Sequence, residues 1–342
     1  MNIKGPLKGI AYNIISLFGL TVIVFILARI LPGSIDALAT LALGPNASSY
    51  AIHQFILEFH LRAPLYLQYW YWINGIFTGN WGISLISHRN VLLDVEQYLP
   101  ATLNLVIVAA IMDILIALPL GLIAGIKENM YADHIIRIIS YIGIAVPPFV
   151  VAIILQLFLG YDLHIFPIIG LLSPGISPPP HITGIYIIDA LITGQFNTWI
   201  NVLWHLILPA FSLILGNFAQ ESRILRASVI QNKNSDYALS EAAYGIPGRV
   251  ILIKYLLKPS LIPMITIYGL DTAYIITNAF LIELIFNIPG FSRYALTAIL
   301  AKDLNAIIAA VLVIGIFFVI ANALVDYIVS VLDPRISKEE SV

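Results

Sequence analysis

The amino-acid sequence predicts an all-α membrane protein that crosses the bilayer six times. Of its 342 residues, 60% are hydrophobic and only 11% are charged. The mean hydropathy of +0.93 is far above that of soluble domains. Helical stretches of about 20 apolar residues suffice to cross the hydrocarbon core. By that criterion, spans are predicted at residues 10–31, 101–126, 134–160, 204–226, 260–286 and 305–331.

The first span also bears on the orientation of the chain. Lys4 and Lys8 precede an apolar run that is too long for the core of a signal peptide, so it is interpreted as a retained helix. With the N-terminus in the cytoplasm, twelve of the 17 Lys and Arg residues lie inside. The positive-inside rule therefore predicts a multi-pass protein of the cell (inner) membrane with both termini in the cytoplasm.

Two segments between the spans are expected on the outer side. Segment 32–100 carries aromatic residues at helical spacing, which predicts short amphipathic helices at the membrane interface. Either an aromatic belt or a contact surface for a partner would explain them. Segment 160–203 contains Pro174 and the run 178–180 but no Lys or Arg, which favours an ordered lid or spacer.

Polar residues inside the predicted spans are few, and they are unfavourable where they face lipid. The candidates for lining a translocation pathway are Asn104, Asp113, Asn217, Asp271 and Asn278. Asp113 and Asp271 lie nearest the middle of their spans. The alternative for each polar residue is a hydrogen bond between helices or contact with water near a span end; the latter applies to Glu221, Glu283 and Asp326.

Composition and motifs give no sign of a catalytic or metal site. The chain has no cysteine, no GxxxxGK[ST] phosphate loop, no HExxH motif and no GxSxG motif. Its seven His residues are scattered, with no helical-turn pair inside a span. The net charge of −2 gives no reason to expect nucleic acid. No catalytic residue, metal or cofactor is therefore predicted on this chain.

The loop that starts at Asp236 is unusually polar for this sequence and is expected in the cytoplasm. Asp236 and Tyr237 open a stretch of good helix formers, LSEAAYG, and Gly245 with Pro247 should end it. A short helix across the cytoplasmic end of the bundle is predicted. The basic amphipathic stretch after it has two interpretations, an ordinary positive-inside anchor or part of a docking site. Charge alone does not distinguish between them.

Short segments along nearly the whole chain share the pattern of one family. They are ARILPGS (28–34), PLYLQY (64–69), GNWGISL (79–85), YLPATLNL (98–105), GIAVPPF (143–149), ITGIYIIDAL (182–191), HLILPA (205–210), RILRAS (223–228), DYALSEAAYGI (236–246), KPSLIP (258–263), FNIPGFSRY (286–294) and LVDYIVSVLDPRIS (324–337). In this order they resemble the inner-membrane permease subunits of ATP-binding-cassette importers of the dipeptide and oligopeptide class.

The resemblance implies the fold of a type I importer permease, with a cytoplasmic coupling helix that docks on an ATP-binding subunit. Carried over by position, the docking residues are Asp236, Tyr237, Glu241, Ala242, Ala243 and Gly245. The class usually has basic residues where this chain has Leu239 and Tyr244, and its EAA triplet is closer to the Gly than in the general importer pattern. The helix is expected to be retained with altered charge complementarity.

The domain organisation follows from the spans and the resemblance. Residues 1–31 form an N-terminal cytoplasmic segment and the first span, and residues 32–100 an extracytoplasmic helical segment. Residues 101–335 form a permease core with five spans and the coupling helix at about 236–246. Residues 336–342 form a cytoplasmic tail.

The resemblance also implies partners and a mechanism. The partners are a second homologous permease, two cytoplasmic subunits that bind ATP and Mg, an extracytoplasmic substrate-binding protein and membrane lipid. ATP binding would close the cytoplasmic subunits and open the pathway outward, and hydrolysis would reverse the change. This chain would form half of the pathway and catalyse nothing itself.

Substrate and mechanism leave alternatives. Di- and oligopeptides are the first expectation. The Ile-rich, Cys-free composition suits a thermophile, and this makes import of oligosaccharides by the same machinery an alternative. A secondary transporter would need coupling-ion sites at broken helices and an internal repeat, and neither is visible in the sequence. An intramembrane enzyme and a purely structural membrane subunit are the remaining hypotheses.

Overall fold

The computed structural model describes residues 4–30, 34–44 and 46–332, so the predicted tail 336–342 lies outside the described residues. The described chain is built of helices and contains no strand, only an isolated bridge between Ile83 and Asn90. The all-α expectation is therefore confirmed.

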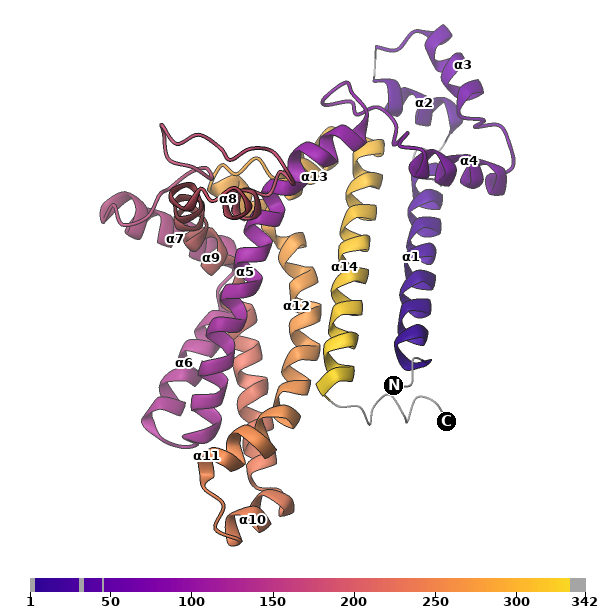
Figure 1. Ribbon diagram of the computed structural model, residues 1–342. Coiled ribbons are helices and arrows are strands. Elements are labelled where there is room, and N and C mark those ends of the chain that lie inside the picture. The colour runs from indigo at the N-terminus through magenta and orange to yellow at the C-terminus, as the bar shows by residue number, and fades with distance from the viewer. Residues whose placement is uncertain (1–3, 31–33, 45, 333–342) are drawn as a thin grey trace.

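The centre of the molecule is a bundle of long helices. These are α5 (Val91–Ile126), α9 (Phe196–Lys233), α12 (Leu257–Ile285) and α14 (Leu304–Leu332), and α1 (Lys4–Ile30) packs against α14 at the edge (Figure 1). Within the described residues, four helical stretches are long and apolar enough to span a membrane by themselves: Val91–Ile126, Phe196–Lys233, Gly248–Thr272 and Leu304–Leu332.

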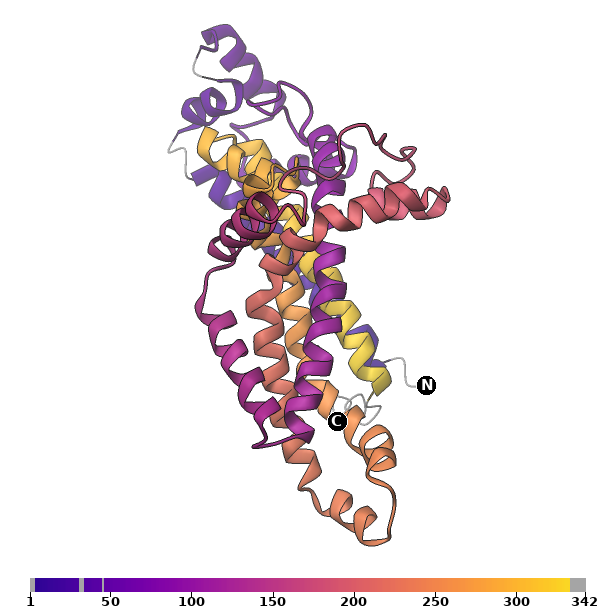
Figure 2. The same ribbon diagram turned by 90° about the vertical axis from the view of Figure 1, so that its left-hand side faces the viewer.

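The third predicted span, 134–160, is not one continuous helix. It consists of α6 (Tyr131–Ala145), α7 (Pro148–Leu155) and the π-helical segment η1 (Gln156–Asp162), with a bend of 105° between α6 and α7. Pro147 has no N–H and disfavours helical backbone at Val146, whose ψ of 124° is extended. Figure 2 shows α6 running beside the bundle below this bend.

The number of spans therefore matches the predicted six only in part. Four helices qualify alone, and the bent pair gives a fifth if it counts as one span. The apolar stretches Ile14–Leu27 of α1 and Tyr274–Ile285 of α12 are shorter. The hydropathy of the sequence predicted continuous spans here, because averaged hydropathy does not detect a bend in the backbone.

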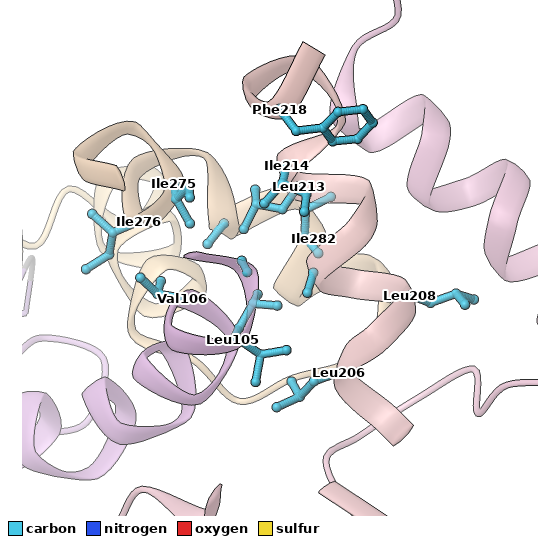
Figure 3. Packing of buried hydrophobic residues seen from close by; sticks show 14 of the residues in the cluster. Leu105, Val106, Leu206, Leu208, Leu213, Ile214, Phe218, Ile275, Ile276 and Ile282 are labelled. Carbon is cyan, nitrogen blue, oxygen red and sulfur yellow. The ribbon is translucent and has the colours of Figure 1, made fainter. Parts of the chain in front are cut away.

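The core of the bundle lies where α5, α9 and α12 meet, and Figure 3 shows its buried aliphatic residues. Two glycines of α5 allow α9 to approach closely. A Cβ added to Gly121 would lie 2.8 Å from the Cβ of Leu225, and one added to Gly125 would lie 2.7 Å from that of Val229. Small residues one turn apart are a common means of close helix packing in membranes.

One end of the bundle carries the short helices expected between the first two spans, and it is called the outer end after the side predicted for it. They are α2 (Ile35–Leu43), α3 (Ser49–Glu58) and α4 (Leu65–Phe77), and the same end holds α8 (Tyr186–Ile192) and α13 (Phe291–Ala301) (Figure 1). The hydroxyl oxygens of Ser34 and Ser48 accept hydrogen bonds from the third residue on and cap α2 and α3.

The expected spacer around the proline run is ordered by one buried carboxylate. Asp189 of α8 is fully buried and accepts hydrogen bonds from the backbone N–H groups of Ile182, Thr183 and Gly184 at 3.2, 2.9 and 2.9 Å. Burial acts to raise the pKa of Asp189, but the hydrogen bonds from Thr183 and its neighbours outweigh it, so this pKa lies below its usual value.

The opposite end of the bundle carries α10 (Asp236–Ala243), α11 (Gly248–Val250) and the π-helical segment η2 (Ile251–Leu256), which leads into α12. The described start of α1 and the end of α14 point to this same end (Figure 1). The molecule thus has one end with outer helices and another with α10 as its projecting element.

Candidate functional site

The short helix predicted in the polar loop at about 236–246 is present as α10, which begins at Asp236 as expected and ends at Ala243. Gly245 follows it with a φ of +79° that favours glycine. The N–H of Gly245 donates to the carbonyl of Ala242 at 3.0 Å, and that of Ile246 donates to the carbonyl of Glu241 at 3.2 Å. This pair of bonds is the Schellman motif, so the predicted stop at Gly245 is confirmed.

A small apolar cluster holds α10 against the chain that leads into α12. Ala238 is buried on one side of α10, where it packs against Ile251 and Leu256. Ile246, the residue after the helix stop, joins the same cluster. The cluster therefore connects α10 to η2, which leads directly into α12.

The opposite side of α10 is open. Five of the six predicted docking residues are exposed and Glu241 is partly exposed; the exposed ones are Asp236, Tyr237, Ala242, Ala243 and Gly245. Leu239 and Tyr244, which replace the family's usual basic residues, are 56% and 85% exposed. The open face is therefore more apolar than the family pattern predicts, and it suits a partner groove with apolar walls.

Asn232 links α10 to two long helices, and sequence reasoning missed it. Its Oδ1 accepts a hydrogen bond from the Tyr237 hydroxyl at 2.9 Å. Its Nδ2 donates to the carbonyl of Ser228 in α9 at 2.9 Å and to the hydroxyl of buried Ser260 in α12 at 3.1 Å. The sequence gives no local signal for this link, because the hydrogen-bond partners of Asn232 lie on three different helices.

A second polar feature lies inside the bundle. Asp113 of α5 and Glu221 of α9 are both fully buried, and they lie close enough for their carboxyl groups to interact electrostatically. Asp271 of α12 lies near enough for its charge to act on both. The hydroxyl of nearby Tyr268 donates to the carbonyl of Ala110 at 2.8 Å rather than to this cluster.

The three carboxyl groups have few partners. Within the described residues, no donor hydrogen-bonds to either oxygen of Asp113 or Glu221, or to Oδ2 of Asp271. Such groups need a proton or a cation to be satisfied in an apolar interior. No set of three or more His, Asp or Glu side chains in the described chain has the arrangement of a metal site.

The five residues predicted to line a pathway do not form one group. Asp113 and Asp271 come together as described. Asn278 is exposed, Asn217 and Asp271 are partly exposed, and Asn104 is buried. The Oδ1 of Asn104 accepts a hydrogen bond from the N–H of Ile187 at 3.0 Å, which ties α5 to α8.

Glu283 holds the outer helix α13 in place. It is fully buried, unlike the water-accessible position considered for it. Its carboxylate accepts hydrogen bonds from the Thr102 hydroxyl at 2.5 Å and from the backbone N–H of Arg293 at 2.7 Å. Gly290 leaves the space that this carboxylate fills, because a Cβ there would lie 2.2 Å from Cδ of Glu283.

A bundle of spanning helices with a projecting short helix at one end defines a membrane subunit of a transporter. Residues 117–338 match the family model for the binding-protein-dependent transport system inner membrane component, and the chain belongs to that family.

Curated relatives match over nearly their full length. The probable D,D-dipeptide transport system permease protein DdpB of Escherichia coli is 34% identical over 94% of this chain and 93% of its own. The dipeptide transport system permease protein DppB of Alkalihalophilus pseudofirmus is also 34% identical, over 94% and 95%. The oligopeptide transport system permease protein AppB of Bacillus subtilis is 29% identical over the same shares.

Proposed function

We propose that this chain is one permease subunit of an ATP-driven importer of di- and oligopeptides. The observation that carries the proposal is the end-to-end similarity to permeases named for dipeptide and oligopeptide transport. The relatives give no support to the oligosaccharide alternative. The exposed apolar face of α10, on a helix fixed to η2 and α12, supports a role in coupling to a partner.

In this proposal α10 docks on a cytoplasmic subunit that binds ATP and Mg. Both termini then lie in the cytoplasm, because α1 begins and α14 ends toward α10 (Figure 1). The outer helices α2 to α4, α8 and α13 face an extracytoplasmic binding protein. A second homologous permease supplies the other half of the pathway, since the bundle exposes large apolar surfaces that lipid or another subunit must cover.

Asp271, Asn217 and Asn278 are the proposed polar residues on the pathway side, because they retain exposure. A peptide carries an α-ammonium group, and the partly exposed Asp271 offers it a carboxylate. Asp113 lies close enough to Asp271 for the two carboxyl groups to interact, but it does not reach the surface. Asn104, which is used between α5 and α8, has a packing role in this scheme.

The test is to reconstitute the complete complex in liposomes and to measure ATP hydrolysis with its binding protein. Stimulation by peptide-loaded binding protein, together with uptake of labelled peptide, is the expected result. Stimulation by oligosaccharide but not by peptide would replace the substrate and keep the mechanism. A complex without ATPase activity in the presence of any loaded binding protein would contradict the importer assignment.

A further inference from the structure

A cavity at the outer end of the first span combines one arginine with several aromatic residues. Its volume is about 240 Å³, and it lies between the outer helices and the start of α14. Arg29 lines it together with Trp72, Trp81, His60 and Asn305. Neither the docking helix α10 nor the buried carboxyl groups contribute to it, and the proposed function does not use it.

The guanidinium of Arg29 is held in position on one side and open on the other. Its Nε donates to Oε1 of Gln68 at 3.1 Å, and it stacks 5.0 Å from the ring centroid of Phe25. Gln68 is itself fixed, since its Nε2 donates to the carbonyls of Leu61 and Ala63 at 2.9 and 2.8 Å. Such an arrangement prepares the two Nη groups to receive a ligand.

No carboxylate of the described chain lies within 4 Å of the Arg29 guanidinium. An arginine without a carboxylate partner can bind an anion through two of its oxygens, as in a phosphate. Glu58 also lines the cavity, but it is exposed, so water screens its repulsion of an anion.

The position of the cavity relative to the membrane identifies where such an anion would come from. The apolar stretch Ile14–Leu27 of α1 ends two residues before Arg29, which places the guanidinium at the level of lipid headgroups. Helix α4 lies across this end of α1 (Figure 1). It exposes Tyr66, Trp70 and Phe77 to 72, 64 and 85%, as aromatic residues at a membrane interface do.

We propose that this cavity binds the phosphate of a membrane phospholipid, with Arg29 as the anion ligand. The aromatic side chains of the cavity surround the glycerol region. The acyl chains lie along α1, which exposes Ile15 and Phe18 to 63 and 59% on its span. The lipid would join α1 to the outer helices and to the start of α14, three parts of the chain that otherwise meet around an open cavity.

The test compares Arg29→Gln with Arg62→Gln. Arg62 is an exposed arginine of the same outer segment that lines an adjoining cavity shared with Arg29, but not the proposed lipid cavity, so it controls for the loss of a positive charge nearby. The assembled complex is delipidated in detergent, titrated with phosphatidylglycerol and examined by native mass spectrometry. Wild type and R62Q should retain one phosphatidylglycerol more tightly than R29Q, by about tenfold in apparent affinity. Diacylglycerol with the same acyl chains should not occupy this site.

The proposal would be overturned if R29Q and R62Q retained phosphatidylglycerol equally, or if wild type retained diacylglycerol as well as the phospholipid. Displacement of the lipid by millimolar inorganic phosphate would also overturn it, because that result would indicate a site for free phosphate. Arg29→Lys tests the same point if R29Q fails to assemble. It keeps the charge but loses the two-pronged contact, so it should bind phosphatidylglycerol more weakly than wild type while its melting temperature stays close to that of R62Q.

Discussion

At the scale of single residues, function in this protein depends on polar groups that connect helices. Asn232 uses both ends of its amide to join α9, α10 and α12. Because α10 is the proposed docking element, Asn232 provides a polar connection from it to α12, the helix that carries Asp271. An apolar cluster around Ala238 provides a second, less directional route.

Replacing Asn232 by Ala should therefore weaken the coupling between ATP hydrolysis and transport. We expect substrate-stimulated ATPase activity to fall by about fivefold or more, within the usual range of coupling energies between sites. Asn234→Ala is the matched control, since the side chain of this exposed neighbour is not part of the link. The measurement is ATPase activity of the reconstituted complex, with and without loaded binding protein. An unchanged ratio in N232A would exclude this route.

Asp271 is the residue that best separates a pathway role from a packing role. Asp271→Asn keeps the size of the side chain and removes its charge, so peptide uptake should fall while assembly persists. N-acetylated peptides, which lack the α-ammonium group, should lose less in the variant than free peptides. Uptake assays in liposomes measure both. If D271N reduces the yield of assembled complex instead, the carboxylate has a structural role.

Asp113→Asn is a useful companion variant because Asp113 is fully buried. Its effect on uptake should be smaller than that of D271N, since its carboxyl group does not reach the pathway surface.

At the scale of helices, proline and glycine decide how the elements meet. Pro147 breaks the predicted third span into α6 and α7. At the inner end of α6, the fully buried Asp133 receives a two-pronged contact from Arg226 of α9, with Nε–Oδ1 at 2.5 Å and Nη2–Oδ2 at 2.8 Å. This ion pair fixes α6 to α9, although α6 exposes much of its apolar surface.

The close approach of α5 and α9 gives a prediction about stability. Gly125→Ala places a methyl group against Val229 and should destabilise the protein by about 1–3 kcal/mol, the usual cost of overpacking. Gly19→Ala in α1 is the control, because no atom outside its own helix neighbourhood lies within 4 Å of an added Cβ. Thermal unfolding in detergent should show a lower melting temperature for G125A only. Equal melting temperatures would show that the two helices separate easily at this point.

At the scale of the whole molecule, the two ends of the bundle differ in kind. One end carries short helices with many exposed aromatic residues, and the other carries α10 and the described start of α1 (Figures 1 and 2). The excess of Lys and Arg predicted on the α10 side leads us to propose that this side faces the cytoplasm. The absence of cysteine from the sequence makes this orientation easy to test.

Single cysteines at Phe77 and Tyr244, each 85% exposed, should react differently with a membrane-impermeant thiol reagent. In intact cells or right-side-out vesicles, F77C on α4 should be labelled, and Y244C beside α10 should react only after permeabilisation. The readout is the mass shift of the purified subunit, and the cysteine-free parent is the blank. Labelling of Y244C alone in sealed vesicles would invert the topology.

The sequence by itself determined the class of this protein, most of its spans, the short helices between the first two spans, and the start of α10 with its stop at Gly245. These features depend on hydropathy and on local signals such as Gly245, which act within one helix or one turn. Five of the six predicted docking residues could be placed on α10, and Gly245 just after it, for the same reason; their role in docking stays a prediction.

Only the tertiary structure decided the break in the third span, the convergence of Asp113, Glu221 and Asp271, the link through Asn232 and the cavity at Arg29. Each of these joins residues that lie far apart in the chain. A polar residue in a span has the same local pattern whether it faces lipid, a neighbouring helix or a pathway. Its partners are fixed by the way the helices pack, and that packing is a property of the whole bundle.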